Sequence, residues 1–179
     1  MSSKNTRLLP LASTLFLVGI FTFVVHEFAH WLAGTLLGYP MRMTPNQAHS
    51  TTPMLPLHES IVSAAGPLVT YAQAAVGYRL VTRRSALVGF ALVYMAFFMR
   101  LVAMGVSTFN PNDEARISLE LGLGLWTLPA LAVAVLLVLV VLASRRMRIH
   151  VREQLVCYLV ASIVVTAFVG VDALWFRRT

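Results

Sequence analysis

The sequence predicts an all-α protein, a polytopic bundle of about five transmembrane helices. Of its 179 residues, 58% are hydrophobic and only 12% are charged, which is too apolar for an ordinary soluble domain. The apolar residues also form uncharged runs, most of which approach or exceed the roughly 18 residues that a spanning helix needs. We expect a single transmembrane domain over residues 1–179, with spans at approximately residues 9–38, 60–79, 85–109, 121–143 and 154–175.

The first apolar run follows a basic N-terminus, as the core of a signal peptide would. The segment His-Glu-Phe-Ala-His begins at residue 26, where a cleavage site should lie, and the apolar run then resumes to about Tyr39. We therefore expect a retained helix of about 30 residues, which tilts or projects beyond the lipid or breaks near Gly34 or Gly38.

The two longest polar interruptions follow the first and third spans. Residues 39–59 are rich in Pro, Thr, Asn, Gln and His, and their prolines exclude a continuous helix. We expect an ordered or mobile loop there, on the outer side or dipping partly into the protein. Residues 110–114, with the sequence Asn-Pro-Asn-Asp-Glu, form a turn signal with two adjacent acids. No internal repeat or boundary of a second domain is visible.

The net charge of +7 could suggest a nucleic-acid partner. The basic residues, however, form short clusters between the apolar runs, which is the placement expected of membrane topology signals. We expect the lipid bilayer and no nucleic acid as a partner. With five spans, nine of the fourteen Lys and Arg residues share one side: Lys4, Arg7, Arg79, Arg83, Arg84, Arg145, Arg146, Arg148 and Arg152. The positive-inside rule then predicts a cytoplasmic N-terminus and an outer C-terminus.

The segment His26-Glu27-Phe28-Ala29-His30 has the spacing of a zinc-hydrolase site. Residues four apart lie about 40° apart around a helix and one turn along it, so both imidazoles can face one zinc ion beside Glu27. Zinc makes water more acidic, and the carboxylate can take its proton as the water attacks a carbonyl. Ionisable groups between apolar runs are energetically costly and often mark a site. Alternatively, the three ionisable residues could cap a helix end at the membrane interface or form a hydrogen-bond cluster between two helices.

A catalytic zinc normally takes a third protein ligand. The sequence has one cysteine, Cys157, so a cage of several thiolates and an intrachain disulfide are both excluded. We expect Cys157 to pack between helices. Asp113 is the first candidate, because it lies at the outer end of the third span. The His pair lies in the outer part of the first span and so at the same depth. The other candidates are, in order, Glu114, His58, His49 and Glu59. Asp113 has an alternative role as the N-cap of a helical segment starting at Glu114.

Two further polar residues interrupt apolar spans. Arg100 requires an acid, a carbonyl or a route to the interface, and its candidate acids are Asp113, Glu114 and Glu120. It could instead stabilise a tetrahedral oxyanion. Gln73 could hydrogen-bond an extended substrate or join two helices. For both residues we favour the structural interpretation.

Three motifs occur in a characteristic order: His26-Glu27-x-x-His30 with Trp31-Leu32-Ala33-Gly34 after it, Ser63-Ala64-Ala65-Gly66-Pro67-Leu68, and Asn110-Pro111-Asn112-Asp113. In these motifs, roughly over residues 15–118, the chain resembles the site-2 protease family of intramembrane zinc metalloproteases. It departs from the family pattern at Thr70, where Asn is common, and around Asp113, where Leu-Asp-Gly is usual. Both Asp113 and Glu114 therefore remain candidates for the third ligand.

The resemblance implies an intramembrane zinc metalloendopeptidase that cleaves transmembrane or membrane-anchored protein substrates, in a bacterial cytoplasmic membrane. It implies Zn2+ bound by His26, His30 and Asp113, with Glu27 as the catalytic base. We expect a minimal member, because no PDZ-like insertion or nucleotide-binding domain fits within this length. Small and polar residues could line the substrate path: Gly34, Thr35, Gly66, Thr70 and Gln73.

Two other functional classes remain open at this stage. The chain could be a non-catalytic scaffold or binding protein that keeps a relic of a zinc site, although its two histidines and intervening Glu are intact. It could also be an ion-conducting or transporter subunit that relays ions through intramembrane His, Glu and Arg. The absence of an inverted repeat and the short chain disfavour the transporter.

Overall fold

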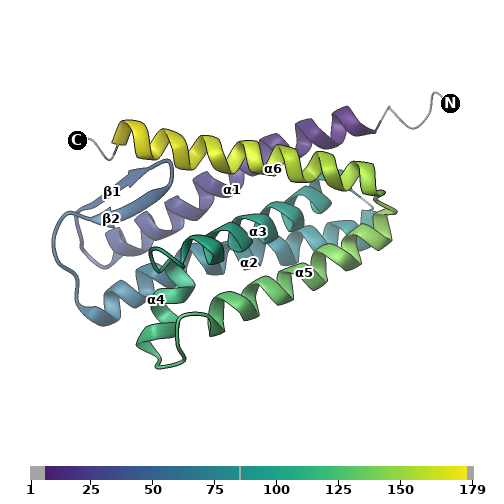
Figure 1. The fold of residues 1–179 in the computed structure, drawn as a ribbon. Helices are drawn as coiled ribbons and strands as arrows, with labels where there is room; N and C mark the ends of the chain where they lie inside the picture. Colours follow the sequence, from purple (N-terminus) through teal and green to yellow (C-terminus); the bar gives the residue numbers. More distant parts are fainter. Residues whose placement is uncertain (1–6, 85, 177–179) are drawn as a thin grey trace.

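The computed structural model describes residues 7–84 and 86–176 and confirms the predicted all-α bundle (Figure 1). A two-stranded hairpin is inserted after the first helix. The elements are α1 (Leu8–Leu36), β1 (Met41–Thr44), β2 (Gln47–Ser50), α2 (Pro56–Arg84), α3 (Leu87–Val106), α4 (Asp113–Glu120), α5 (Thr127–Met147), α6 (Val151–Val171) and the π-helical turn η1 (Asp172–Phe176).

Within the described residues, four helices are long and apolar enough to cross a membrane, as expected of a multi-pass membrane protein. They are α1, α3, α5 and the continuous stretch Val151–Leu174. The second predicted span, residues 60–79, corresponds to α2, which is 29 residues long but is not among the four. Its polar residues Ser63, Thr70 and Gln73 are buried inside the protein. The membrane crossing of α2 stays a prediction.

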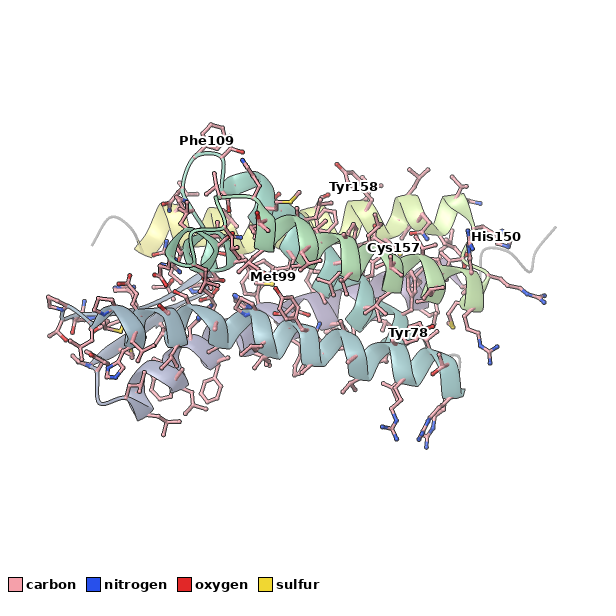
Figure 2. All side chains as sticks on the ribbon, turned by 90° about the horizontal axis from the view of Figure 1, so that it is seen from below. Tyr78, Met99, Phe109, His150, Cys157 and Tyr158 are labelled. Atoms are coloured by element: carbon pink, nitrogen blue, oxygen red, sulfur yellow. The ribbon has the colours of Figure 1, made fainter. Side chains whose placement is uncertain are left out.

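The helices pack so that α2 contacts both α1 and α3, α5 covers α3, and α6 lies along α1 (Figure 1). Fully buried side chains from α1, α3 and α6 form the main apolar core, among them Leu15, Phe90, Met95 and Val164. Cys157 is also buried in this core, as its predicted packing role requires. Met99 points into the bundle, whereas Phe109, on the loop after α3, projects from it (Figure 2).

The predicted basic segments meet at one end of the bundle. Arg7 donates a hydrogen bond to the Met147 carbonyl at 3.2 Å, and Arg146 donates one to the Thr82 carbonyl at 3.4 Å. The start of α1, the end of α2 and the α5–α6 junction are therefore neighbours, while the hairpin and α4 lie toward the other end (Figure 1). Which end faces the cytoplasm stays a prediction from the positive-inside rule.

Part of the predicted loop at residues 39–59 is an antiparallel hairpin, with its register running from Met41 opposite Ser50 to Thr44 opposite Gln47. The prolines do not prevent it, because Pro40 precedes β1 and Pro45 lies in the two-residue turn. Pro56 is the first residue of α2, a position where a missing backbone N–H carries no penalty.

The N-cap of α4 is Asn112, whose side chain accepts a hydrogen bond from the Ala115 N–H at 3.2 Å. The alternative expectation that Asp113 caps this helix is therefore wrong. An Asn side-chain oxygen is as effective at this position as an Asp carboxylate. The carboxylate of Asp113 is left to project from the first turn of α4.

Helices α2 and α3 approach closely at two glycines. A Cβ atom on Gly89 would lie 2.7 Å from the Gly77 carbonyl oxygen and 2.8 Å from the Leu80 Cβ. Small residues at such a crossing let two helix backbones come together in a membrane protein. Gly105, on the same helix, has no atom within 4 Å of the corresponding position.

We predict that Gly89→Ala lowers the free energy of unfolding by about 1–3 kcal/mol, because the new methyl group overlaps α2 backbone. The matched substitution Gly105→Ala should leave stability unchanged or slightly raised, since alanine favours a helix over glycine. Reversible unfolding of the purified protein in detergent measures both. Equal stabilities of the two variants would contradict the close crossing.

Candidate metal centre

Helix α1 places His26 and His30 one turn apart on its buried face, as the sequence predicts. The two side chains are almost fully enclosed, with exposed fractions of 2% and 5%. Their Nε2 atoms face each other at 3.1 Å. The two imidazoles are thus directed at one point rather than at opposite sides of the helix.

Asp113 brings a third ligand atom to the same point from the start of α4. Its Oδ2 lies 3.3 Å from His26 Nε2 and 3.4 Å from His30 Nε2. Tetrahedral zinc with bonds of about 2.0–2.1 Å would hold its ligand atoms about 3.3–3.4 Å apart. The triangle formed by the three atoms has nearly this size, so His26, His30 and Asp113 could hold a metal ion.

The hydrogen bonds behind the rings place a proton on each Nδ1, which in a neutral imidazole leaves the lone pair on Nε2. His30 Nδ1 lies 2.6 Å from the Val62 carbonyl oxygen, which can only accept, so Nδ1 carries the proton. Thr70 donates its hydroxyl hydrogen to the Gly66 carbonyl, so its oxygen accepts from His26 Nδ1 at 3.0 Å. A neutral imidazole protonated at Nδ1 is a ligand through Nε2. Two lone pairs and a carboxylate oxygen therefore converge on one point.

Gly66 provides the space in which the two rings meet. A Cβ atom at this position would overlap the His30 ring and would lie 2.7 Å from His26 Nε2. The Gly-Pro motif, the second element of the family resemblance, thus lies directly against the histidine pair. Val62, Gly66 and Thr70 are spaced four apart on α2 and so share one face of the helix.

The second oxygen of Asp113 is held separately from the first. Arg116, one turn later on α4, donates from Nη2 to Asp113 Oδ1 at 2.9 Å. Because Oδ1 is occupied by this contact, Oδ2 is the oxygen that faces the two imidazoles. Arg116 is thus a positioning residue for the third ligand atom.

Glu114, the second candidate for the third ligand, points elsewhere. It forms an ion pair with Arg100 at 3.0 Å, and its Oε1 accepts a hydrogen bond from the Tyr71 hydroxyl at 2.8 Å. Adjacent helical residues point about 100° apart, which separates the roles of Asp113 and Glu114. Arg100 thus pairs with these two acids, whereas Glu120 accepts a hydrogen bond from Ser60.

The remaining candidates do not join the group of ligand atoms within the described residues. His58 contacts the Tyr39 hydroxyl through Nδ1 at 2.9 Å. His49 and Glu59 line the cavity next to the site but are not part of the group. Gln73 donates to Thr22 Oγ1 at 2.9 Å and to the Leu92 carbonyl at 3.1 Å, so it joins three helices, as the structural interpretation requires.

The ligand atoms open onto a cavity of about 670 Å³. Glu27 lines it beside His26 and His30 and is itself only 5% exposed. One wall is polar and comes from β2 and the loop before α4. Its apolar lining includes the following residues of α3 and α6: Val102, Ala103, Val106, Val165 and Val169.

Sequence reasoning missed Tyr71 as a partner of Glu114 and the Val62 carbonyl as a partner of His30. Tyr71 follows Thr70 directly and carries no distinguishing pattern of its own. The Val62, Gly66 and Thr70 spacing is a helical-face signal that could have indicated which side of α2 meets the histidines.

Comparisons with known proteins give no match to a family model, a curated protein or a solved structure. The resemblance to site-2 proteases therefore stays a prediction. Any functional assignment must come from the geometry of the site itself.

We predict that Asp113→Ala lowers zinc affinity by more than about 100-fold, because a lost ligand should cost more than a lost outer-shell partner. Glu114→Gln, the adjacent matched substitution, should keep zinc affinity within about tenfold because Glu114 binds Arg100 instead. Competition with a chromogenic chelator, checked by mass spectrometry of bound metal, measures both. Zinc loss in the Glu114 variant alone would reverse the assignment of the third ligand.

Proposed function

We propose that the chain is an intramembrane zinc metalloprotease that hydrolyses peptide bonds of transmembrane or membrane-anchored proteins. One observation carries this proposal. Three lone-pair-bearing atoms, from His26, His30 and Asp113, converge beside the Glu27 carboxylate in a cavity within a bundle of apolar helices. Ionisable groups inside a bundle of membrane-spanning helices are energetically costly and often mark a functional site.

This donor set suits a borderline metal, and zinc is the ion that we propose for it. Two imidazole nitrogens and one carboxylate oxygen are the protein ligands of many catalytic zinc sites, which leave a fourth position open. Carboxylate-rich sites suit magnesium and calcium, and thiolate-rich sites suit copper(I) and iron–sulfur clusters. When bound, zinc would supply Lewis acidity, which polarises a carbonyl and makes water easier to deprotonate.

Glu27 is the proposed proton carrier. Its carboxylate takes a proton from water as the water oxygen forms a bond to the carbonyl carbon. It then delivers that proton to the amide nitrogen as the carbon–nitrogen bond breaks. Thr70 and the Val62 carbonyl keep the two imidazole rings in orientation throughout this sequence.

The hairpin supports the proposal that the substrate binds in extended form. Thr44 and Gln47 close a two-residue turn and therefore form a hydrogen-bonded pair, as do Arg42 and His49. The backbone N–H and C=O groups of Ala48 and Ser50 consequently point away from β1. Residues of β2, but not of β1, line the cavity. An unwound segment could add to this edge as a further strand.

The apolar walls support a membrane segment as the substrate. Val102 and Val106 on α3 and Val165 and Val169 on α6 present branched apolar side chains to the cavity. They suit the apolar side chains of a transmembrane segment, while the β2 edge suits its unwound backbone. We further propose that the basic end of the bundle faces the cytoplasm.

We predict that Glu27→Gln abolishes cleavage of a transmembrane reporter and leaves zinc bound, because the amide cannot take a proton but does not alter the ligands. The loss should be about 100-fold or more in kcat, the contribution of a general base. Cleavage in proteoliposomes and metal content of the same sample measure the two effects. Full cleavage by the Gln variant would remove Glu27 as the base, and an inactive wild type that holds zinc would favour a non-catalytic scaffold.

We predict that Ala48→Pro raises KM at least about tenfold, because proline removes the outward N–H that the added strand would use. Proline is tolerated at a strand edge, so zinc binding should persist. Ala48→Val keeps the N–H and serves as the matched control. Steady-state cleavage of a reporter peptide separates KM from kcat. If the proline and valine variants behave alike, strand addition at this edge is wrong.

A further inference from the structure

Arg100 is a buried cation within an apolar span, with only 4% of its surface exposed. Such a group is energetically costly in a membrane and requires counter-ions. Its Nη1 provides the pairing, with donor distances of 3.2 and 3.0 Å to the two oxygens of Glu114. The Tyr71 hydroxyl adds a further donor to the same carboxylate. The charge of Glu114 is therefore balanced by the guanidinium, and Tyr71 gives its carboxylate a further hydrogen bond.

The other end of the guanidinium is directed at the metal centre. Nη2 donates a hydrogen bond to His26 Nε2 at 3.3 Å, and no hydrogen bond from Nη2 to Glu114 is formed among the described residues. Nε has no hydrogen-bond partner in the part of the chain that the structure describes. A purely structural pair would be expected to use the two-nitrogen fork on one carboxylate. Here Nη1 binds the Glu114 carboxylate, and Nη2 faces the metal centre.

The guanidinium lies along one edge of the ligand triangle. Nη2 is 3.3 Å from His26 Nε2, and Nη1 is 3.4 Å from Asp113 Oδ2. The fourth position of a tetrahedral site is itself about 3.3–3.4 Å from each ligand atom. Arg100 also lines the cavity that Glu27 lines. A carbonyl bound at this edge of the triangle would lie beside Nη2.

We propose that Arg100 is a catalytic residue whose Nη2 donates a hydrogen bond to the oxygen of the scissile carbonyl as negative charge develops on it. This role rests on the proposed peptidase function. As the water oxygen bonds to the carbonyl carbon, the π electron pair moves to the carbonyl oxygen, where the N–H stabilises it. The pair then reforms the carbonyl while the carbon–nitrogen bond breaks and the nitrogen takes the proton held by Glu27.

Arginine suits this role because its guanidinium stays protonated and can donate without transferring its proton. Glu114 and Tyr71 hold the Nη1 end and leave Nη2 as the group available to substrate. The competing account is that Arg100 only neutralises Glu114. The two accounts differ in what happens when both charges are removed together.

The double variant Arg100→Gln with Glu114→Gln separates them. It replaces the ion pair by a neutral pair and so leaves no buried charge stranded. We expect this variant to keep zinc and to lose about 100- to 1,000-fold in kcat, the effect of removing one oxyanion donor. KM should change by less than about threefold, because the donor acts on the transition state rather than on bound substrate. A double variant with wild-type kcat would reduce Arg100 to a structural counter-ion.

Ligand binding gives a readout that does not depend on turnover. A phosphonate peptide carries a tetrahedral anion, whereas a hydroxamate peptide of the same sequence binds chiefly through the metal. We expect the double variant to bind the phosphonate at least about 100-fold more weakly and the hydroxamate within about threefold of wild type. An equal loss for both ligands would overturn the role, because it would indicate general damage to the metal centre.

Arg100→Lys tests the role if the double variant does not fold. Lysine keeps the charge beside Glu114 but lacks the second nitrogen that faces the site. It should fold, bind zinc and lose at least about tenfold in kcat. Wild-type kcat in this variant would overturn the role of Nη2. A wild-type protein that binds zinc and cleaves no membrane substrate would instead overturn the proposed peptidase function, and this role with it.

Discussion

Two imidazole nitrogens and a carboxylate oxygen that lie within about 3.4 Å of one another repel, when none is protonated, unless a cation lies among them. Much of the structure around the site serves to hold these atoms together. Helix α1 sets the spacing of His26 and His30, and α2 directs both rings through Thr70 and the Val62 carbonyl. The start of α4 then brings in Asp113. The site is therefore preorganised by three separate helices rather than by one motif.

This requirement explains the polar character of α2, the long helix that is least like a membrane span. Its buried Ser63, Thr70 and Gln73 face the neighbouring helices, and two of them make hydrogen bonds to α1 residues. The buried charges near the site are also paired with one another. Arg100 pairs most closely with Glu114 inside the bundle and also lies 3.4 Å from Asp113 Oδ2, the oxygen that faces the two imidazoles. The polar residues of this group are thus buried inside the bundle, while many branched and aromatic side chains lie on its outer surface.

The sequence predicted the features that depend on local spacing. Apolar runs located the long helices, and the four-residue interval placed His26 and His30 on one face. It could not separate Asp113 from Glu114, because their directions depend on where α4 begins, and that is decided by the cap at Asn112. The hairpin was missed because its prolines lie just before β1 and in the turn, where strands tolerate them. Tyr71 and Val62 were missed because their contacts arise only when α2 packs against its neighbours.

We propose that two imidazole nitrogens and one carboxylate oxygen, from His26, His30 and Asp113, bind one metal ion inside the bundle. X-ray absorption at the zinc K-edge of the purified, zinc-loaded protein measures this most directly. We expect a four-coordinate shell with two imidazoles and oxygen ligands at about 2.0–2.2 Å. A six-coordinate shell of oxygens without the imidazole scattering pattern would show that zinc binds elsewhere, and the site would then have no metal-dependent chemistry to perform.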